Sequence, residues 1–232
     1  MTEPGPRRGR THDAEGAREA ILDAAEAVFA EHGFDGARVD AIAAAAHYNK
    51  SLIFQYFGDK LGLYNAVIRR ADDQTREMQI QVIGSLLDDE VIFDAHKVRT
   101  LLETFLGAYF DYLVEHPRIA RIYVWEMAEG WQTYAKILSQ RDYEDVEQFG
   151  PLLLKLQNAG MMRSGINPMM QIMLVFFLGP VYLALVPMAH IMLPGTDFSS
   201  PAALAAARQY ITDFIVRGIM ANPVETKPQK GD

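Results

Sequence analysis

The stretch AHYNKSLIFQYFGDK, residues 46–60, decides the fold of the N-terminal part of this chain. Aromatic residues stand in it beside amides and lysines: Tyr48, Phe54, Tyr56 and Phe57 with Asn49, Gln55, Lys50 and Lys60. Aromatic side chains usually lie inside a fold, whereas lysines and amides usually stay exposed. The stretch is therefore either an ordinary amphipathic helix or a helix whose outer face contacts another molecule.

Three helices are predicted around this stretch. The first runs from Asp13 to Gly33. Its apolar residues recur on one helical face and are Ile21, Leu22, Ala25, Val28 and Phe29. A second, short helix fits residues 39–46, and a third fits residues 50–57, before Gly58. Two short helices joined by a tight turn are typical of a helix-turn-helix.

The apolar positions give the two short helices an inner and an outer side. The inner side holds Ile42, Ala43, Ala46, Ile53 and Phe57, with the ring of Tyr48 expected beneath the turn. The outer side holds Asn49, Lys50, Ser51, Leu52, Phe54, Gln55 and Tyr56. A hydrophobic core does not need this mixture of a cation, amides, a hydroxyl and aromatic rims. The mixture is typical of a helix that faces a nucleic-acid groove.

Helical periodicity continues to the C-terminus without long period-two strands, which predicts an all-α protein of about nine helices. Further helices are expected at 60–87, 96–115, 118–128, 131–159, 167–193 and 201–221. The expected organisation is a flexible basic arm at 1–12, a helix-turn-helix domain at 13–68 with its motif at about 38–58, a helical body at 69–222, and a polar tail at 223–232. The arm is either a disordered tail or a segment that lies along DNA phosphates.

Composition limits the kinds of chemistry that are available. The chain has 232 residues and no cysteine, which excludes disulfides, thiolate metal sites and cysteine nucleophiles and fits a cytoplasmic protein. The net charge is −8, but residues 1–70 carry nine Lys and Arg against ten Asp and Glu. The acidic excess therefore belongs to the remainder of the chain. An acidic body argues against broad binding to DNA or to anionic membranes, yet leaves room for a small basic face.

Three motifs in the right order resemble those of the TetR-type (tetracycline-repressor-like) transcriptional regulators. They are ILDAAEAVFAEHG at 21–33, VDAIAAAA at 39–46 and KSLIFQYFGDKLGL at 50–63. From about residue 18 to residue 70 the sequence matches the family position by position. The rest of the chain matches only in its expected helical organisation. It implies a homodimer that binds a palindromic double-stranded operator as a repressor and is released by a small molecule bound in the body.

The resemblance also implies roles for individual residues. Lys50 and Lys60 would hold phosphates, Gln55 would pair with adenine, and Asn49 or Tyr56 would reach bases or backbone. Ser51 lies on the same face. The chain departs from the family pattern at Arg38, where Thr or Ser usually contacts phosphate, at His47, where Gly is usual, at Leu52, and at Phe54, where a Tyr hydroxyl is usual. We expect Arg38 to contact phosphate, the alternative being a free surface arginine, and His47 to adopt a left-handed conformation. Leu52 would meet a thymine methyl, and Phe54 would either pack on a sugar or a thymine methyl or sit inward.

Residues 166–194 are the most apolar part of the chain. Their length permits a membrane span, but Gly179, Pro180 and Pro187 interrupt them and no Lys/Arg cluster flanks them. We therefore expect no membrane insertion. The resemblance instead implies that this helix and the alanine-rich helix after Ser200 form a four-helix dimer interface.

Aromatic and polar residues in the body are candidates for an effector site. They are Tyr109, Tyr112, Trp125, Glu126, Trp131, Tyr134, Phe176, Phe177 and His190. Core packing is the alternative for each aromatic residue. Glu126 either faces solvent or receives a cationic ligand beside Trp125, and His190 is either a core or interface histidine or a ligand contact. The implied effector is apolar to aromatic.

Motifs for catalysis, metals and cofactors are missing from the sequence. The six histidines show no metal-ligand spacing, and the sequence has no HExxH motif, nucleophile elbow or phosphate-binding glycine loop. We therefore expect no cofactor and no enzyme activity. The alternatives are a helical small-molecule-binding protein that has lost DNA binding and, less favoured, an all-helical enzyme.

Overall fold

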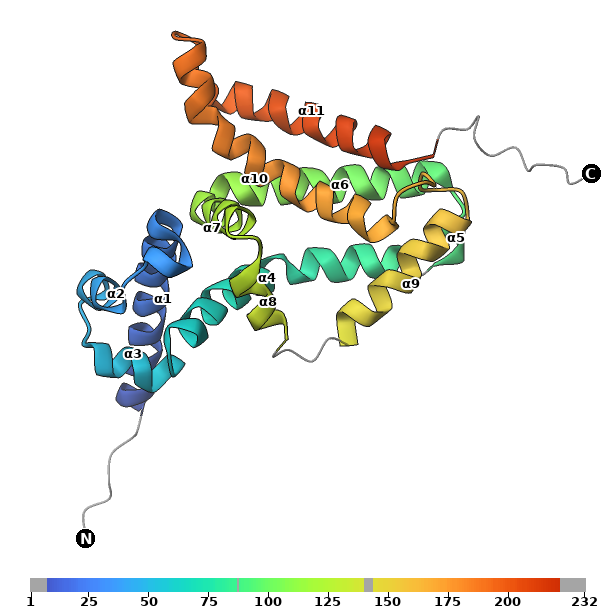
Figure 1. Cartoon of the computed structure of the whole chain (residues 1–232). Helices are drawn as coiled ribbons and strands as arrows, with labels where there is room; N and C mark the ends of the chain where they lie inside the picture. Colours follow the sequence, from blue (N-terminus) through green and yellow to red (C-terminus); the bar gives the residue numbers. More distant parts are fainter. Residues whose placement is uncertain (1–7, 87, 140–143, 222–232) are drawn as a thin grey trace, which may run out of the picture. The chain divides into compact units, whose positions relative to one another are not determined.

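The structure is a computed structural model that describes the backbone of residues 8–86, 88–139 and 144–221. Its side chains are described from Ala14 onward, apart from residue 89 and residues 140–149 within that range. These residues form eleven helices, and their one β-feature is an isolated bridge between Met162 and Met220 (Figure 1). The predicted all-α class is confirmed. The expected tail at 223–232 and residues 1–7 of the expected arm lie outside the described residues.

The helices follow the predicted order with three differences, the first being that the N-terminal helix begins at Arg8, within the expected arm, and not at Asp13. Their bounds are α1 Arg8–Gly36, α2 Val39–Ala46, α3 Lys50–Phe57, α4 Lys60–Leu86, α5 Asp89–Ile92, α6 Ala95–Glu115, α7 Pro117–Ala128, α8 Gln132–Leu138, α9 Glu144–Asn158, α10 Pro168–Met192 and α11 Pro201–Ile219. The short α5 was not predicted; Asp88 caps it by accepting the backbone N–H of Glu90 at 2.8 Å. The single helix expected at 131–159 is wrong, because α8 ends at Leu138 and α9 begins at Glu144.

The chain forms two compact units, each described by itself. Unit 1 contains Met1–Gln74 and Arg121–Arg141, and unit 2 contains Thr75–Ala120 and Asp142–Asp232. Helices α4 and α7 therefore contribute residues to both units. The sequence predicts a boundary between the helix-turn-helix domain and the helical body after residue 68. That boundary separates functional parts and not compact units, and it stays a prediction.

In unit 1, α1 packs against α2, and α2 against α3. Phe29 of α1 and Tyr64 of α4 lie edge to face in the core, with ring centroids 4.8 Å apart. The guanidinium of Arg70 ties α4 to α1 by ion pairs of 2.7 Å to Asp23 and 2.6 Å to Glu26. These contacts give the helix-turn-helix a fixed support.

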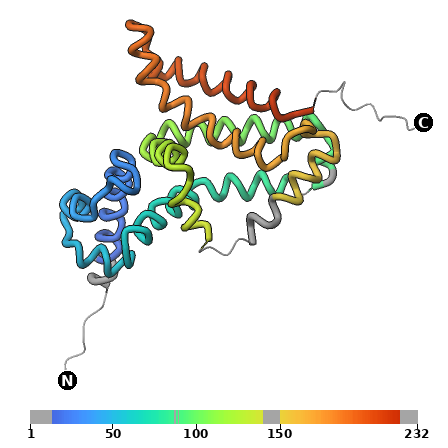
Figure 2. Tube along the Cα trace, viewed as in Figure 1, coloured from blue at the N-terminus to red at the C-terminus, as the bar shows by residue number. Residues whose placement is uncertain are grey.

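In unit 2, α6, α10 and α11 pack side by side (Figures 1 and 2). Their shared core includes Phe105, Phe110, Val175, Ile211 and Ile215. Gly107 allows α11 to approach α6, since a Cβ there would meet the guanidinium of Arg208. The Nε of Arg208 donates to the Gly107 carbonyl at 3.2 Å and to Asp111 at 2.9 Å. Close packing around one glycine thus joins α6 to α11.

Candidate nucleic-acid interface

The turn of the helix-turn-helix has the conformation expected from the sequence. Ile42, Ala43 and Ala46 of α2 are buried, and Ile53 of α3 has no exposed surface. His47 is left-handed, with φ 59° and ψ 31°, and its N–H reaches the carbonyls of Ala43 and Ala44. The predicted left-handed conformation of His47 is confirmed. It closes α2 and starts the tight turn into α3.

Asn49 begins α3 and Gly58 ends it. The Asn49 side-chain oxygen accepts the backbone N–H of Leu52 at 2.8 Å, so Asn49 is the N-cap, and its amide nitrogen can still donate to another molecule. Gly58 has a φ of 78°, and Asp59 then caps α4 by accepting the N–H of Gly62 at 2.7 Å. Both ends of α3 are therefore held by local hydrogen bonds.

The outer face of α3 is open to solvent. Lys50, Ser51, Phe54 and Gln55 are exposed, whereas Leu52 and Tyr56 are half-buried. The expectation that Tyr48 lies beneath the turn is wrong, because its side chain is 37% exposed; the buried residues there are Ala43, Ala46 and Ile53. Phe57 is half-buried rather than sealed, and the guanidinium of Arg18 lies over its ring at 5.3 Å.

Lys50 is engaged within the protein. Its Nζ lies 3.0 Å from a carboxylate oxygen of Asp40 on α2 and 5.8 Å from the ring centroid of Phe54. All of these groups are exposed, and an exposed ion pair is worth about 0–1 kcal/mol. Lys50 can therefore exchange Asp40 for a phosphate at small cost. Sequence reasoning missed Asp40, because no helical spacing links residues on two different helices.

Arg38 and Lys60, the other predicted phosphate contacts, differ in their surroundings. Arg38 is exposed and precedes α2 in an extended conformation, without a side-chain cap bond. The Nζ of Lys60 donates to the Asp35 carbonyl at 3.2 Å and lies 4.6 Å from the Phe34 ring centroid. Burial lowers the pKa of Lys60, while the charges of Asp35 and Glu129 oppose the shift. Lys60 thus caps the end of α1, and its role toward phosphate stays a prediction.

The nine candidate effector residues divide between the two units. In unit 2, Tyr109 lies 5.3 Å from Phe176 and 6.5 Å from Tyr112 between ring centroids, with Phe105 beside them. Phe177 is half-buried on α10. His190 lies about 21 Å along α10 from Phe176, at 1.5 Å per residue. Its Nε2 accepts the N–H of Phe198 at 3.2 Å, so it belongs to the end of α10 rather than to this aromatic cluster.

The candidates in unit 1 are Trp125, Glu126, Trp131 and Tyr134. Trp131 and Tyr134 lie edge to face at 5.9 Å, and the indole N–H of Trp125 donates to the Ala30 carbonyl at 3.2 Å. The alternative that Glu126 faces solvent is wrong, because Glu126 is completely buried. Its two oxygens accept the Tyr64 hydroxyl at 2.6 Å and the Tyr134 N–H at 3.1 Å.

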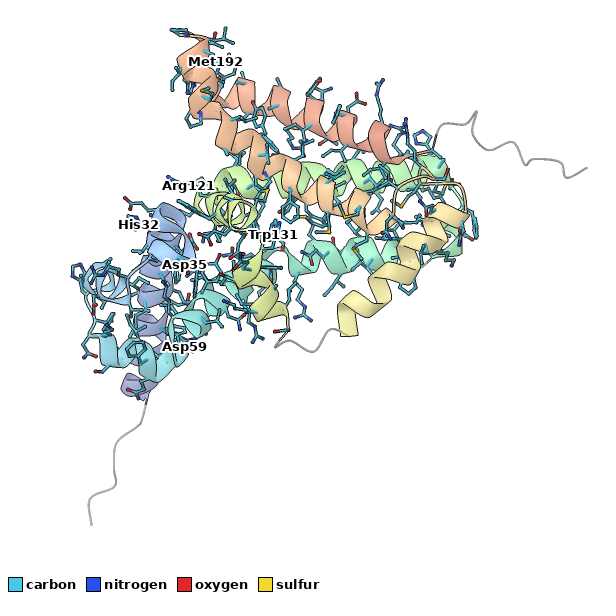
Figure 3. The ribbon with its side chains drawn as sticks, viewed as in Figure 1. His32, Asp35, Asp59, Arg121, Trp131 and Met192 are labelled. Carbon is cyan, nitrogen blue, oxygen red and sulfur yellow. The ribbon has the colours of Figure 1, made fainter. Side chains whose placement is uncertain are left out.

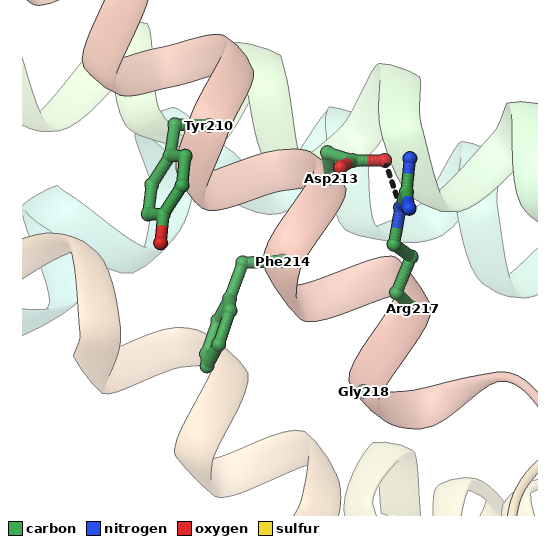
Figure 4. A pocket seen from close by; sticks show the side chains of 5 residues that line it. All are labelled: Tyr210, Asp213, Phe214, Arg217 and Gly218. Carbon is green, nitrogen blue, oxygen red and sulfur yellow. Dashed lines mark hydrogen bonds and ion pairs between the residues drawn. The ribbon is translucent and has the colours of Figure 1, made fainter.

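Helices α10 and α11 carry exposed apolar faces. On α10 the exposed apolar residues include Met170, Leu174, Val181, Leu185, Met188 and Ile191, which lie three, four or seven positions apart and so share one side of the helix. On α11, Tyr210 and Phe214 stack with centroids 6.3 Å apart and line a groove of about 250 Å³ with Asp213, Arg217 and Gly218 (Figure 4). The four-residue spacing of the two aromatic rings is readable in the sequence, although the groove was not predicted.

Helix α10 is also long and apolar enough to cross a membrane, with a mean hydropathy of 2.2 in its most apolar window. One such helix is weak evidence of a span by length and composition alone. No group of three or more His, Cys, Asp or Glu suited to a metal ion occurs among the described residues.

Two sequence profiles match the chain, one in each part. The profile described as "Bacterial regulatory proteins, tetR family" matches residues 21–67, and that described as "Tetracyclin repressor-like, C-terminal domain" matches residues 99–215. The first match contains α2 and α3 entirely, and the second contains α7 to α10. Both parts of the chain therefore match the same family.

Known proteins agree with these matches. The chain is 34% identical over 117 residues to the HTH-type transcriptional repressor SCO4008 of Streptomyces coelicolor, covering 50% of this chain and 53% of that protein. The chain thus spans about half the length of this curated relative. Solved structures of similar fold include the ketosteroid transcriptional regulator KstR2 of Mycobacterium tuberculosis, with a TM-score of 0.58, 17% identity and coverage of 88% and 95% of the two chains. Another is FadR of Bacillus subtilis in complex with stearoyl-CoA, with a TM-score of 0.58, 18% identity and coverage of 87% and 98%. With its helix-turn-helix and helical body matched in turn, the chain belongs to the TetR family of bacterial regulatory proteins.

Proposed function

We propose that this protein is a repressor that binds double-stranded operator DNA through the outer face of α3. The observation that carries the proposal is the polarity of α3, on which buried Ile53 fixes the helix and Lys50, Phe54 and Gln55 stand exposed. A helix of this kind fits the major groove, where a Gln amide pairs with adenine and an apolar side chain meets a thymine methyl. Lys50 and Arg38 supply charges for phosphate oxygens.

The operator would be bound by two copies of the chain. TetR regulators bind operator DNA, usually as dimers. The exposed apolar faces of α10 and α11 supply a self-complementary surface for a twofold partner. A twofold dimer presents two α3 helices to successive major grooves, about 34–36 Å apart, and predicts a palindromic operator.

A small apolar or aromatic molecule would lower operator affinity from within unit 2. Tyr109, Phe105 and Phe176 form a cluster of rings on α6 and α10 that suits such a ligand. The ligand acts only if it binds one conformation of the protein more tightly than the other. Members of this family are soluble cytoplasmic regulators that bind small-molecule effectors.

Selection of bound fragments from genomic DNA tests the proposal. The purified protein is incubated with sheared DNA at a stated salt concentration, because phosphate contacts make affinity strongly salt-dependent. Enrichment of a twofold-symmetric sequence is the expected result. Absence of any enriched sequence would favour a small-molecule-binding protein without DNA binding. Apolar compounds added to the same assay then identify the effector by release of the enriched duplex.

A further inference from the structure

Glu126 is a completely buried carboxylate that recognition of DNA by α3 does not use. Its Oε1 accepts the Tyr64 hydroxyl at 2.6 Å, and its Oε2 accepts the Tyr134 backbone N–H at 3.1 Å. A carboxylate removed from water is costly unless its oxygens are hydrogen-bonded. The two donors therefore tie the end of α7 to α4 on one side and to α8 on the other.

Tyr64 carries this connection into the core of the DNA-binding part. It is almost completely buried, and its ring lies edge to face with Phe29 at 4.8 Å and with Phe34 at 5.2 Å. Burial, followed by the hydrogen bond to Glu126, raises the pKa of the Tyr64 hydroxyl above its ordinary value. The hydroxyl therefore stays protonated and remains a donor to Glu126.

Further contacts hold residues 121–139, the α7–α8 segment, against the end of α1. The indole N–H of Trp125 donates to the Ala30 carbonyl at 3.2 Å. Gly33 breaks the regular helix with φ 67°, and a Cβ built on it would lie 2.9 Å from Glu129 and 3.1 Å from the Trp125 ring. Figure 3 marks Asp35 near the end of α1 and Trp131 just before α8. Helix α2 packs on α1, so the α7–α8 segment contacts the helix that supports the helix-turn-helix.

We propose that Glu126 is a positioning residue for DNA binding, which acts through Tyr64 to couple operator binding to the packing of residues 121–139 against α1 and α4. The proposal rests on the function proposed above. Helix α7 begins in unit 2 at Pro117 and its residues from Arg121 onward belong to unit 1. The segment is thus a second chain connection between the units, besides α4. Coupling is reciprocal. If packing of this segment against α1 and α4 strengthens operator binding, operator binding must stabilise that packing by the same free energy.

Hydrogen exchange measured by mass spectrometry tests this coupling without an effector. The probe is the operator duplex recovered by selection, and the readout is exchange in peptides covering residues 121–139 of the full chain. In the wild type, operator binding should slow exchange there, including the Tyr134 amide that donates to Glu126. A random duplex of equal length should slow it less.

Tyr64→Phe removes the hydroxyl and keeps the ring between Phe29 and Phe34. We expect its operator Kd to rise about 5–50-fold, within the range of ordinary allosteric coupling, and the DNA-linked slowing of exchange to disappear. Glu126→Gln leaves one acceptor oxygen for two donors and should act in the same direction. The double variant should lose less than the sum of the two single losses, because both changes act on the contact between the same two side chains. Tyr182→Phe, at a half-buried tyrosine packed against the core of unit 2, is the matched control and should stay within about twofold of wild type.

The outcomes separate the coupling from the function on which it rests. A wild type that binds no duplex overturns the proposed function, and the coupling with it. A wild type that binds its operator without any change of exchange in 121–139 overturns the coupling alone. A Tyr64→Phe protein with a lower melting temperature but an intact DNA-linked change of exchange assigns the bond to stability, which also overturns the coupling.

Discussion

Gln55 lies exposed on α3, two residues after Ile53, whose burial fixes which side of the helix faces outward. A Gln amide can donate to adenine N7 and accept from its N6 amino group at once. Gln55→Ala should therefore relax preference at one base pair of each half-site by about 1–3 kcal/mol. Titration of operator duplexes that differ at single positions measures this loss.

The control for Gln55 is Gln81→Ala, which removes an exposed glutamine from α4 in unit 2. It should leave the ranking of the duplexes unchanged. If Gln55→Ala weakened operator and random duplexes equally, Gln55 would contact the backbone and would read no base.

Asp40 holds the Nζ of Lys50 at 3.0 Å and adds a negative charge beside the proposed DNA surface. Asp40→Asn keeps the size of the side chain but frees Lys50 for phosphate. Affinity for random duplex DNA should rise by about two- to fivefold at low salt, in line with the small worth of exposed ion pairs. Fluorescence anisotropy at several salt concentrations measures this affinity.

Lys50→Gln is the paired variant, and it should reduce the salt slope by about one. An Asp40→Asn protein with wild-type affinity for random DNA would mean that Lys50 takes no part in phosphate binding.

Residue-level reasoning succeeded where local chemistry decides the outcome. The burial of Ile53 and the left-handed His47 were predictable, because both depend on neighbours within one turn. Tyr48 was misplaced inside, since smaller residues already fill the space around the turn. The role of Asp40 depends on the angle between two helices, which sequence spacing does not contain.

At the scale of elements, Gly33 is where α1 departs from helical geometry, with φ 67° and ψ −177°. This region is essentially confined to glycine, and a new Cβ would also press on Glu129 and Trp125. Gly33→Ala should destabilise the protein by about 1–3 kcal/mol. Thermal unfolding measures the change.

The matched control is Gly16→Ala in the same helix, where an added Cβ meets no atom within 4 Å. That substitution should stabilise the protein by about 0.5–1 kcal/mol. If both variants melted at the same temperature, the break at Gly33 would carry no strain.

Glu129 at the end of α7 gives a pH dependence. Burial first, and then the charges of Asp35 and Glu126, raises the pKa of its carboxyl above the usual value, while Lys60 opposes the shift. A carboxyl with a raised folded-state pKa favours folding below its unfolded pKa, and that contribution is lost as pH rises through the folded pKa. Glu129→Gln should therefore raise the melting temperature at pH 7, and the gain should shrink as pH falls toward 4.

Melting curves of the wild type and of Glu129→Gln at pH 7 and pH 4 measure the dependence. Equal differences at both pH values would exclude ionisation as the cause. Glu77→Gln, at an exposed position of α4 in unit 2, controls for the loss of one carboxylate elsewhere in the chain.

Helix existence was readable from apolar periodicity, and the starts of α10 and α11 were marked by proline after Asn167 and Ser200, which cap these helices. The division of residues 131–159 was not readable. Ser139 looks like any helix-surface residue in the sequence, yet α8 ends at Leu138 and α9 begins at Glu144. Periodicity reports which face is buried, not where along the segment a helix ends.

At the scale of the whole molecule, the assignment of residues to units could not be predicted. The segment 121–141 belongs to the DNA-binding unit although it lies far along the chain, because Glu126 and Trp125 contact Tyr64 and Ala30. Those contacts join residues more than sixty positions apart. For the same reason the nine predicted effector residues divide between two units, whereas sequence proximity had suggested one site.

The dimer proposed above is the property of the whole molecule on which operator binding would depend. Leu174 on α10 and Phe214 on α11 are 64% and 59% exposed in the single chain, so a charge at either position costs the folded monomer little. In a dimer the same charge would be buried without a partner, which is strongly unfavourable. Leu174→Glu and Phe214→Asp should therefore shift the protein from dimer to monomer in sedimentation velocity.

Both variants should also lose most of their operator affinity, since one α3 reaches only half of a palindromic site. Ile80→Glu is the control, because Ile80 is 58% exposed on α4 in unit 2 and lies outside the proposed interface. It should stay dimeric and bind the operator normally. Dimeric Leu174→Glu and Phe214→Asp proteins would place the interface elsewhere. A wild-type monomer that floats with lipid vesicles would assign the apolar face of α10 to a membrane instead, and the control variant would then float equally well.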